Sequence, residues 1–150
     1  MDPTTDQRPD DVRPGLPRRR APVKRKPSKE QPAKPDEQAL ALARRIVDLA
    51  SDKKASDIVL LEVRELTTLA DYFVICSGTS ERQVNAIAGG IADGLRDEGT
   101  KPVGREGSPN AHWMLLDYGS VIVHVMAPPE RDFYQLERLW ADAPLLLRVQ

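Results

Sequence analysis

The 150-residue chain is long enough for one ordinary domain and too short for two sizeable ones. Its net charge of −1 conceals two unlike parts. Residues 1–35 hold ten Lys and Arg against five Asp and Glu, a net charge of +5, whereas residues 36–150 hold twelve against eighteen, a net charge of −6. No stretch approaches the roughly 20 apolar residues of a membrane helix, so we expect no membrane-spanning segment.

The N-terminal sequence and the cysteine content indicate the cellular compartment of the protein. It begins with no apolar run, which argues against a secretory signal, and its early acids, Asp2, Asp6, Asp10 and Asp11, argue against a mitochondrial transit peptide. Cys76 is the only cysteine, which excludes an internal disulfide and suits a reducing compartment. We therefore expect a cytoplasmic protein.

Residues 1–35 are predicted to form a disordered basic tail ahead of one domain at 36–150. The tail holds eight of the thirteen prolines, and its only sizeable apolar residues are Val12, Leu16 and Val23. Such a segment cannot bury enough surface to offset its ordering entropy. Its basic runs could contact RNA phosphates or could simply solubilise the chain. These runs are Arg18, Arg19, Arg20 and Lys24, Arg25, Lys26.

The first half of the domain predicts a helix followed by two buried strands. Apolar residues recur at three- and four-residue steps over residues 36–52, which is the pattern of an amphipathic helix. Runs of apolar, largely β-branched residues at 57–63 and 72–76 predict the two strands.

A second helix is predicted to begin after Ser80. The spacing of Ser80 and Gln83 matches a capping box, in which Ser80 accepts the amide of Gln83 while the Gln83 side chain reaches back to the amide of Ser80. Gly99 stands where a left-handed C-cap is expected.

The second half of the domain predicts more strands and a closing helix. Residues 102–107 are expected to be extended, and residues 113–117 and 120–126 to form a hairpin around Tyr118-Gly119. Phe133, Leu136, Leu139 and Trp140 have helical spacing and predict a helix from about Glu130 to Trp140. Within it, most of the set Tyr134, Leu136, Glu137, Leu139 and Trp140 is expected to serve packing and part of it dimerisation. This order of elements predicts an α/β fold, a mixed sheet with helices packed against it.

Six strings in this order resemble the ribosome-silencing factor (RsfS/Iojap) family, and together they cover roughly residues 37–142. They are DIV at 57–59, DYFVICSGTS at 71–80, EG at 106–107, WMLLDYG at 113–119, VIVHV at 121–125 and the pattern in YQLERLW at 134–140. The basic tail has no counterpart in this pattern, and the segment 108–112 departs from it.

The resemblance implies a nucleotidyltransferase-like fold without nucleotidyl transfer, without a cofactor and usually as a homodimer. It also implies a function. Members dock on ribosomal protein number fourteen of the large subunit and sterically block joining of the small subunit, which represses translation when nutrients are scarce. In that setting the basic tail could contact ribosomal RNA.

The family match assigns Trp113, Leu115, Asp117 and Tyr118 to the docking surface, with Glu106 near it. Alternation along the strand independently places Trp113, Leu115 and Asp117 on one face. Met114 and Leu116 then point to the core. A tryptophan at the centre of an interface can contribute about 2–4 kcal/mol. The alternatives are a core tryptophan and, for Glu106, a solvated loop charge.

We assign no chemical role to the remaining reactive side chains. His124 alternates with Ile122 and Met126 on an apolar face, which favours a core histidine satisfied by a hydrogen bond over a contact residue. Cys76 lies within an apolar strand, where cysteines are usually inert. His112 is a lone loop histidine and supports no assignment.

Two other functions fit the sequence less well. A nucleotidyltransferase-like enzyme needs paired carboxylates for metal ions, but the candidate strand offers only Asp117. A serine triad of Ser80, His124 and Asp117 conflicts with the capping role of Ser80, and the scattered His and Cys residues do not suit zinc. An RNA-binding module acting through the tail would lack an aromatic and basic strand face in its core. We therefore expect a binding protein rather than an enzyme.

Overall fold

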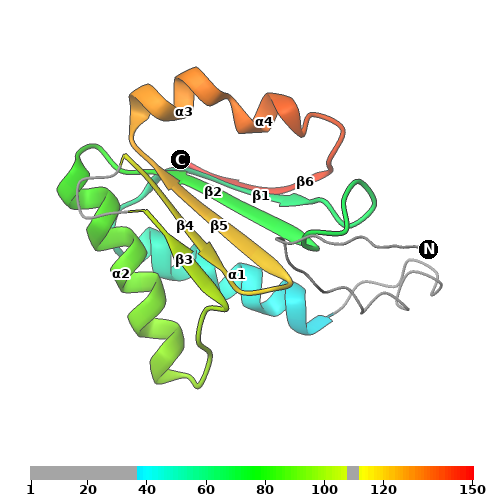
Figure 1. Cartoon of the computed structure of the whole chain (residues 1–150), viewed down its shortest axis with the longest axis horizontal. Helices are drawn as coiled ribbons and strands as arrows, with labels where there is room; N and C mark the ends of the chain where they lie inside the picture. The colour runs from blue at the N-terminus through cyan, green and yellow to red at the C-terminus, as the bar shows by residue number, and fades with distance from the viewer. Residues whose placement is uncertain (1–36, 108–111) are drawn as a thin grey trace, which may run out of the picture. The chain divides into compact units, whose positions relative to one another are not determined.

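The structure is a computed structural model, and it describes residues 37–107 and 112–150. These residues form a mixed α/β body (Figure 1). Its elements in chain order are α1 (Glu37–Asp52), β1 (Ser56–Glu62), β2 (Tyr72–Ser77), α2 (Glu81–Asp97), β3 (Gly104–Glu106), β4 (Trp113–Asp117), β5 (Val121–Met126), α3 (Pro128–Tyr134), α4 (Leu136–Leu139) and β6 (Leu145–Val149). The predicted α/β class with a mixed sheet is confirmed.

The six strands form one sheet in the order β3-β4-β5-β2-β1-β6. Only β2 and β5 run parallel, with Tyr72 opposite Val121, and every other neighbouring pair is antiparallel. The predicted hairpin is present as β4 and β5, with Asp117 opposite Ile122. Parallel neighbours need a long crossover connection, and here it contains α2, β3 and β4.

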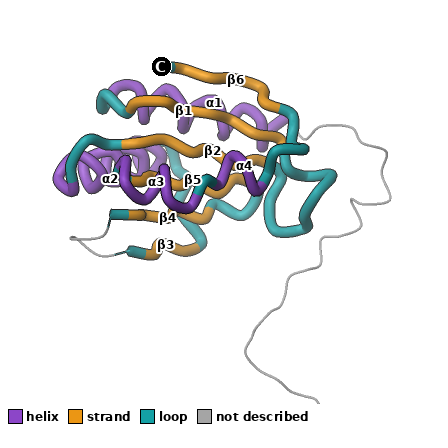
Figure 2. Tube along the Cα trace, turned by 90° about the horizontal axis from the view of Figure 1, so that it is seen from above, coloured by secondary structure: helices purple, strands orange, loops and turns teal. Residues whose placement is uncertain are grey.

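Helices lie on both faces of this sheet (Figure 2). The face that we call the helical face is covered by α1 and α2, and its core joins both helices to alternate residues of β1, β2, β4 and β5. The opposite face, which we call the α3 face, has a smaller core that includes Phe73, Ile75, Met126 and Leu136. The side chains of one strand alternate between the two cores.

Local signals explain how α2 begins and ends. Ser80 Oγ accepts the backbone amide of Gln83 at 3.1 Å, as predicted. The Gln83 side chain also reaches back, and its Oε1 accepts the amide of Thr79 at 2.6 Å rather than that of Ser80. At the other end Gly99 has a φ of +90°, which is the left-handed conformation predicted for it.

The C-terminal region differs from the prediction in two ways. The expected single helix from Glu130 to Trp140 is wrong: α3 and α4 are separate, because Gln135 between them has a left-handed φ of 47°. The expected packing role is also wrong for Leu139, which is 72% exposed, whereas Leu136 and Trp140 do pack on the α3-face core.

The structure also adds a strand that the sequence did not predict. β6 pairs antiparallel with β1 and forms one edge of the sheet, with Leu60 opposite Leu147. Its leucines are partly exposed, at 37–50%. Among the described residues, no helix has both the length and the apolar composition needed to cross a bilayer.

Candidate functional site

Four of the five family-matched residues come together at the β3–β4–β5 part of the α3 face. On β4, the partly exposed Trp113, Leu115 and Asp117 alternate with the buried Met114 and Leu116, as predicted. β3 places Glu106 directly opposite Leu115. Glu106, which the sequence placed in a loop, and Leu115 are therefore neighbours on adjacent strands.

Ile122 belongs to the same surface. It is the cross-strand partner of Asp117, it is partly exposed, and it packs against the α3-face core. We define the β4 surface as the five side chains on this part of the α3 face, which are Glu106, Trp113, Leu115, Asp117 and Ile122. It combines two aliphatic groups and one indole with two carboxylates.

Trp113 is held on both sides. Its indole Nε1–H donates to Nδ1 of His124 at 3.1 Å, and its ring centroid lies 4.8 Å from that of Tyr134 on α3. Because the ring also packs against the α3-face core, Trp113 is both partly exposed and structurally engaged. The ring thus has a packed part, as the core alternative expects, and an exposed part, which the docking alternative requires.

His124 is buried at 7% exposure and supports Trp113 from below. Burial lowers the pKa of His124 to about 4, so the imidazole is neutral near neutral pH. Because Nδ1 accepts the hydrogen bond from Trp113, the ring hydrogen must lie on Nε2, which has no hydrogen-bond partner among residues 37–107 and 112–150. The interpretation of His124 as a hydrogen-bonded core histidine is confirmed.

Asp117 and Tyr118 shape the turn at the end of β4. One carboxylate oxygen of Asp117 accepts the amide of Gly119 at 2.7 Å, and Gly119 has a φ of +83°, which favours glycine at this position. Tyr118 is only 8% exposed and joins the helical-face core. Its side chain is therefore directed away from the β4 surface, although the family match places it there.

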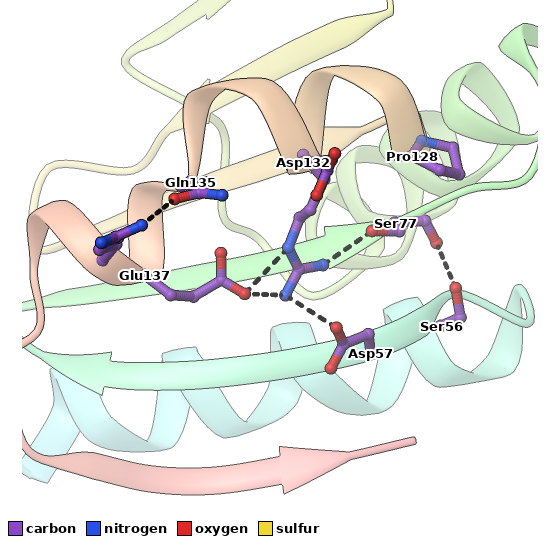
Figure 3. A pocket seen from close by; sticks show the side chains of 9 residues that line it. Ser56, Asp57, Ser77, Pro128, Asp132, Gln135 and Glu137 are labelled. Atoms are coloured by element: carbon purple, nitrogen blue, oxygen red, sulfur yellow. Dashed lines mark hydrogen bonds and ion pairs between the residues drawn. The ribbon is translucent and has the colours of Figure 1, made fainter.

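A network around Arg131 fixes α3 beside this surface (Figure 3). Arg131 is 8% exposed; it donates to Ser77 Oγ at 2.8 Å and to Glu137 Oε2 at 2.6 and 3.0 Å. It also lies 3.5 Å from Asp57, which is paired with Arg148 of β6 at 2.7 Å. Burial is the largest single influence on the pKa of Glu137 and raises it, but the hydrogen bond and the positive charge of Arg131, with smaller contributions from a backbone hydrogen bond and from Arg148, together leave the pKa below its ordinary value.

These residues line an open pocket of about 470 Å³ between the sheet and the α3–α4 segment. Charged groups of both signs line it, and its central guanidinium is fully engaged by partners within the chain. The pocket thus contains the contacts that attach α3 and α4 to β1 and β2.

A second polar bridge precedes Trp113. Nδ1 of His112 lies 2.9 Å from Glu130 of α3, and Nε2 bonds to Glu81 of α2. These two carboxylates raise the pKa of His112, because each stabilises the charged imidazolium. The bridge ties the N-terminal ends of α2 and α3 to the start of β4.

The side chains that the enzyme hypotheses require make other interactions in the structure. Ser80 caps α2, His124 supports Trp113 and Asp117 holds a turn. The amide of Thr79 is bonded to Gln83, and burial raises the pKa of the Cys76 thiol to about 12. Within the described residues, no group of three or more His, Cys, Asp or Glu side chains could hold a metal ion.

Comparison with known proteins gives this surface a family context. Residues 36–149 match the family model described as "Ribosomal silencing factor during starvation". The chain belongs to the RsfS family. It is 47% identical over 94 residues to the ribosomal silencing factor RsfS of Bacillus subtilis, covering 63% of this chain and 80% of that protein.

More distant members and solved structures agree. The chain is 36% identical over 108 residues to the chloroplastic protein Iojap of Arabidopsis thaliana, covering 72% of this chain and 45% of that protein. A crystal structure from Chromobacterium violaceum has a TM-score of 0.67 at 36% identity, covering 69% of this chain and 86% of the other. One from Bacillus halodurans has a TM-score of 0.63 at 37% identity, covering 75% and 99%.

The RsfS pattern therefore led to four of the five side chains of the β4 surface. Ile122 was not predicted, because a continuous apolar run does not show which of its residues will remain exposed where no helix packs over the strand. Tyr134 was assigned to packing, but it is 47% exposed and contacts Trp113. The possible RNA contacts, Arg18–Arg20 and Lys24–Lys26, lie outside the described residues.

Proposed function

We propose that this RsfS-family protein binds the large ribosomal subunit through a ribosomal protein and blocks joining of the small subunit, without catalysing a reaction. The observation that supports this most directly is family membership over residues 36–149. Following the family resemblance, the proposed partner is ribosomal protein number fourteen. The proposed setting is the cytoplasm.

The β4 surface is the proposed contact. Its aliphatic and aromatic groups supply apolar area, and interface centres are typically built from such anchors. Glu106 and Asp117 supply negative charge, which favours a basic protein surface and disfavours RNA phosphates. Tyr118 is proposed to act through the conformation of the β4–β5 turn, since most of its ring is buried.

The mechanism needs no conformational change in this chain. Strands β4 and β5 hold the contact residues in one register, and the Trp113–His124 hydrogen bond fixes the indole. A preorganised surface loses little conformational entropy when it binds. Once bound, the volume of the domain itself would obstruct the approach of the small subunit.

Co-sedimentation with isolated large and small subunits tests the proposal, with subunit joining followed in the same mixtures. Wild-type protein should sediment with the large subunit only and should inhibit joining. Leu115→Ala and Glu106→Lys should each weaken large-subunit binding on the order of ten-fold. Binding to neither subunit would refute the proposed function.

Asp97→Lys provides a matched control for the charge reversal. Asp97 is an exposed acid at the C-terminal end of α2, which covers the helical face. Reversing it changes the net charge by the same amount as Glu106→Lys, so binding should stay within about two-fold if the β4 surface is the contact. Equal losses for the two variants would indicate long-range charge effects instead.

Two further parts of the proposal concern the whole chain. We propose a homodimer in solution, which light scattering at micromolar concentration would test. We also propose that the basic tail adds salt-sensitive contacts to ribosomal RNA. Deleting residues 1–35 should then reduce large-subunit affinity only in part, whereas a tail-driven RNA-binding module would lose nearly all of it.

A further inference from the structure

Phe133 is an unusual side chain for a short helix packed on a sheet. It is 78% exposed, although burying a phenylalanine side chain would stabilise the fold. An isolated exposed apolar residue requires no explanation. Phe133 is not isolated, however, because its ring meets that of Tyr134 edge to face with centroids 5.0 Å apart.

That contact extends a row of rings that starts inside the protein. From the interior outward the row comprises His124, Trp113, Tyr134 and Phe133, with successive centroids 5.9, 4.8 and 5.0 Å apart. His124 is buried, Trp113 is partly exposed, and Tyr134 and Phe133 are 47% and 78% exposed. The exposed end of the row is thus continuous with the β4 surface.

We propose that Phe133 and Tyr134 form the second half of the docking surface, with Phe133 entering an apolar pocket on a basic protein surface of the large subunit. This inference rests on the proposed function and deepens it. It assigns a contact role to α3, and it commits to a protein partner rather than to RNA.

The attachment of α3 makes this half of the surface preorganised. Arg131, two residues before Phe133, is bonded to Ser77 of β2 and to Glu137 of α4. Glu130, at the start of the helix, is bridged to His112. Because both contacts fix the backbone of α3, Phe133 would lose less conformational freedom on binding than a residue in a loop.

The outward charge of α3 selects the partner. Arg131 is the only basic residue of this helix, and it is buried against acidic and hydroxyl groups. Asp132 is exposed, and the β4 surface adds Glu106 and Asp117. Phosphates would be repelled by these carboxylates, whereas lysine and arginine side chains around an apolar pocket would complement them.

Large-subunit co-sedimentation of Phe133→Ala against Leu69→Ala tests the contact. Leu69 is a comparably exposed apolar residue, at 68%. It lies in the β1–β2 loop just before the start of β2, and this end of the sheet is remote from Trp113 of β4. Phe133→Ala should weaken binding about ten-fold or more, while Leu69→Ala should change it less than about two-fold. Both variants should keep the wild-type melting temperature, because both side chains are mainly exposed.

The partner class is tested with Phe133→p-benzoylphenylalanine and photo-cross-linking on the large subunit. A cross-link to a ribosomal protein is expected, and a cross-link to ribosomal RNA would overturn the assignment. If Leu115→Ala weakens binding but Phe133→Ala behaves like Leu69→Ala, α3 is not a contact although the proposed function stands. If wild-type protein does not bind the large subunit, the proposed function and this extension both fail.

Discussion

The helical face and the α3 face of the sheet are built from alternate residues of the same strands, yet they are covered to different extents. On the helical face, α1 and α2 bury Leu116, Val123 and Val125 completely. On the α3 face, two short helices cover part of the sheet, and Trp113, Leu115 and Ile122 remain partly exposed. Completing the cover would stabilise the fold further, but it would remove the surface proposed for docking.

Neighbouring leucines of β4 allow the sharpest test of this difference. Leu116→Ala should lower the free energy of unfolding by about 3–4 kcal/mol, because Leu116 is fully buried under the helices. Leu115→Ala should cost only about 1 kcal/mol, since Leu115 is partly exposed. Urea denaturation of both variants measures this, and equal losses would mean that the two faces of β4 are not covered to different extents.

The helical face was largely predictable from the sequence, for physical reasons. Long amphipathic helices and apolar strands repeat their burial pattern over many residues, so α1, α2, β1 and β2 appeared within one or two residues of their bounds. Capping at Ser80 added a local signal of the same kind. The alternation along β4 also separated Met114 and Leu116 from the surface residues.

The α3 face was less predictable, because it depends on contacts between distant segments. The break between α3 and α4 requires a left-handed Gln135, and glutamine carries no signal for that conformation. β6 forms only by pairing with β1, and its exposed leucines show no alternation to predict it. Ile122 and Phe133 could be assigned to the surface only once the extent of α3 and α4 was known.

Weakening the attachment of α3 and α4 to the sheet should lower the free energy of unfolding by less than Leu116→Ala does. Arg131→Ala removes three hydrogen bonds and leaves Glu137 without its partner, so we expect a loss of about 2–3 kcal/mol in unfolding free energy. Arg138→Ala is the matched control: Arg138 is exposed and makes one hydrogen bond, to Gln135, so its loss should be within about 0.5 kcal/mol.

The outcome of that comparison also bears on docking. If α3 is a preorganised contact element, Arg131→Ala should weaken large-subunit binding even at temperatures where the variant is fully folded. Unchanged binding by a folded Arg131→Ala variant would show that the position of α3 does not matter for docking. A loss of stability in Arg138→Ala as large as that in Arg131→Ala would contradict the role given to the buried network.

The two histidines should give the smallest effects, with opposite dependence on pH. The pKa of His124 is lowered to about 4 in the folded state, so the unfolded state binds more protons as the pH falls through the window from about 6.5 to about 4. Stability should therefore fall by about 2 kcal/mol between about pH 7.5 and about pH 5 from this group alone. His124→Gln, which can still accept from Trp113, should remove this dependence.

His112 should act in the other direction, because its pKa is raised by the hydrogen bonds that its ring donates to Glu81 and Glu130. Its contribution is fully present below the unfolded pKa of about 6.5 and is lost as the pH rises through the higher folded value. His112→Gln should thus reduce stability near pH 6 more than near pH 8, as followed by thermal melts at both values. A steeper loss at the higher pH would mean that His112 is not held as an imidazolium between α2 and α3. The start of β4 would then depend on Trp113 and the strand pairing alone for its position.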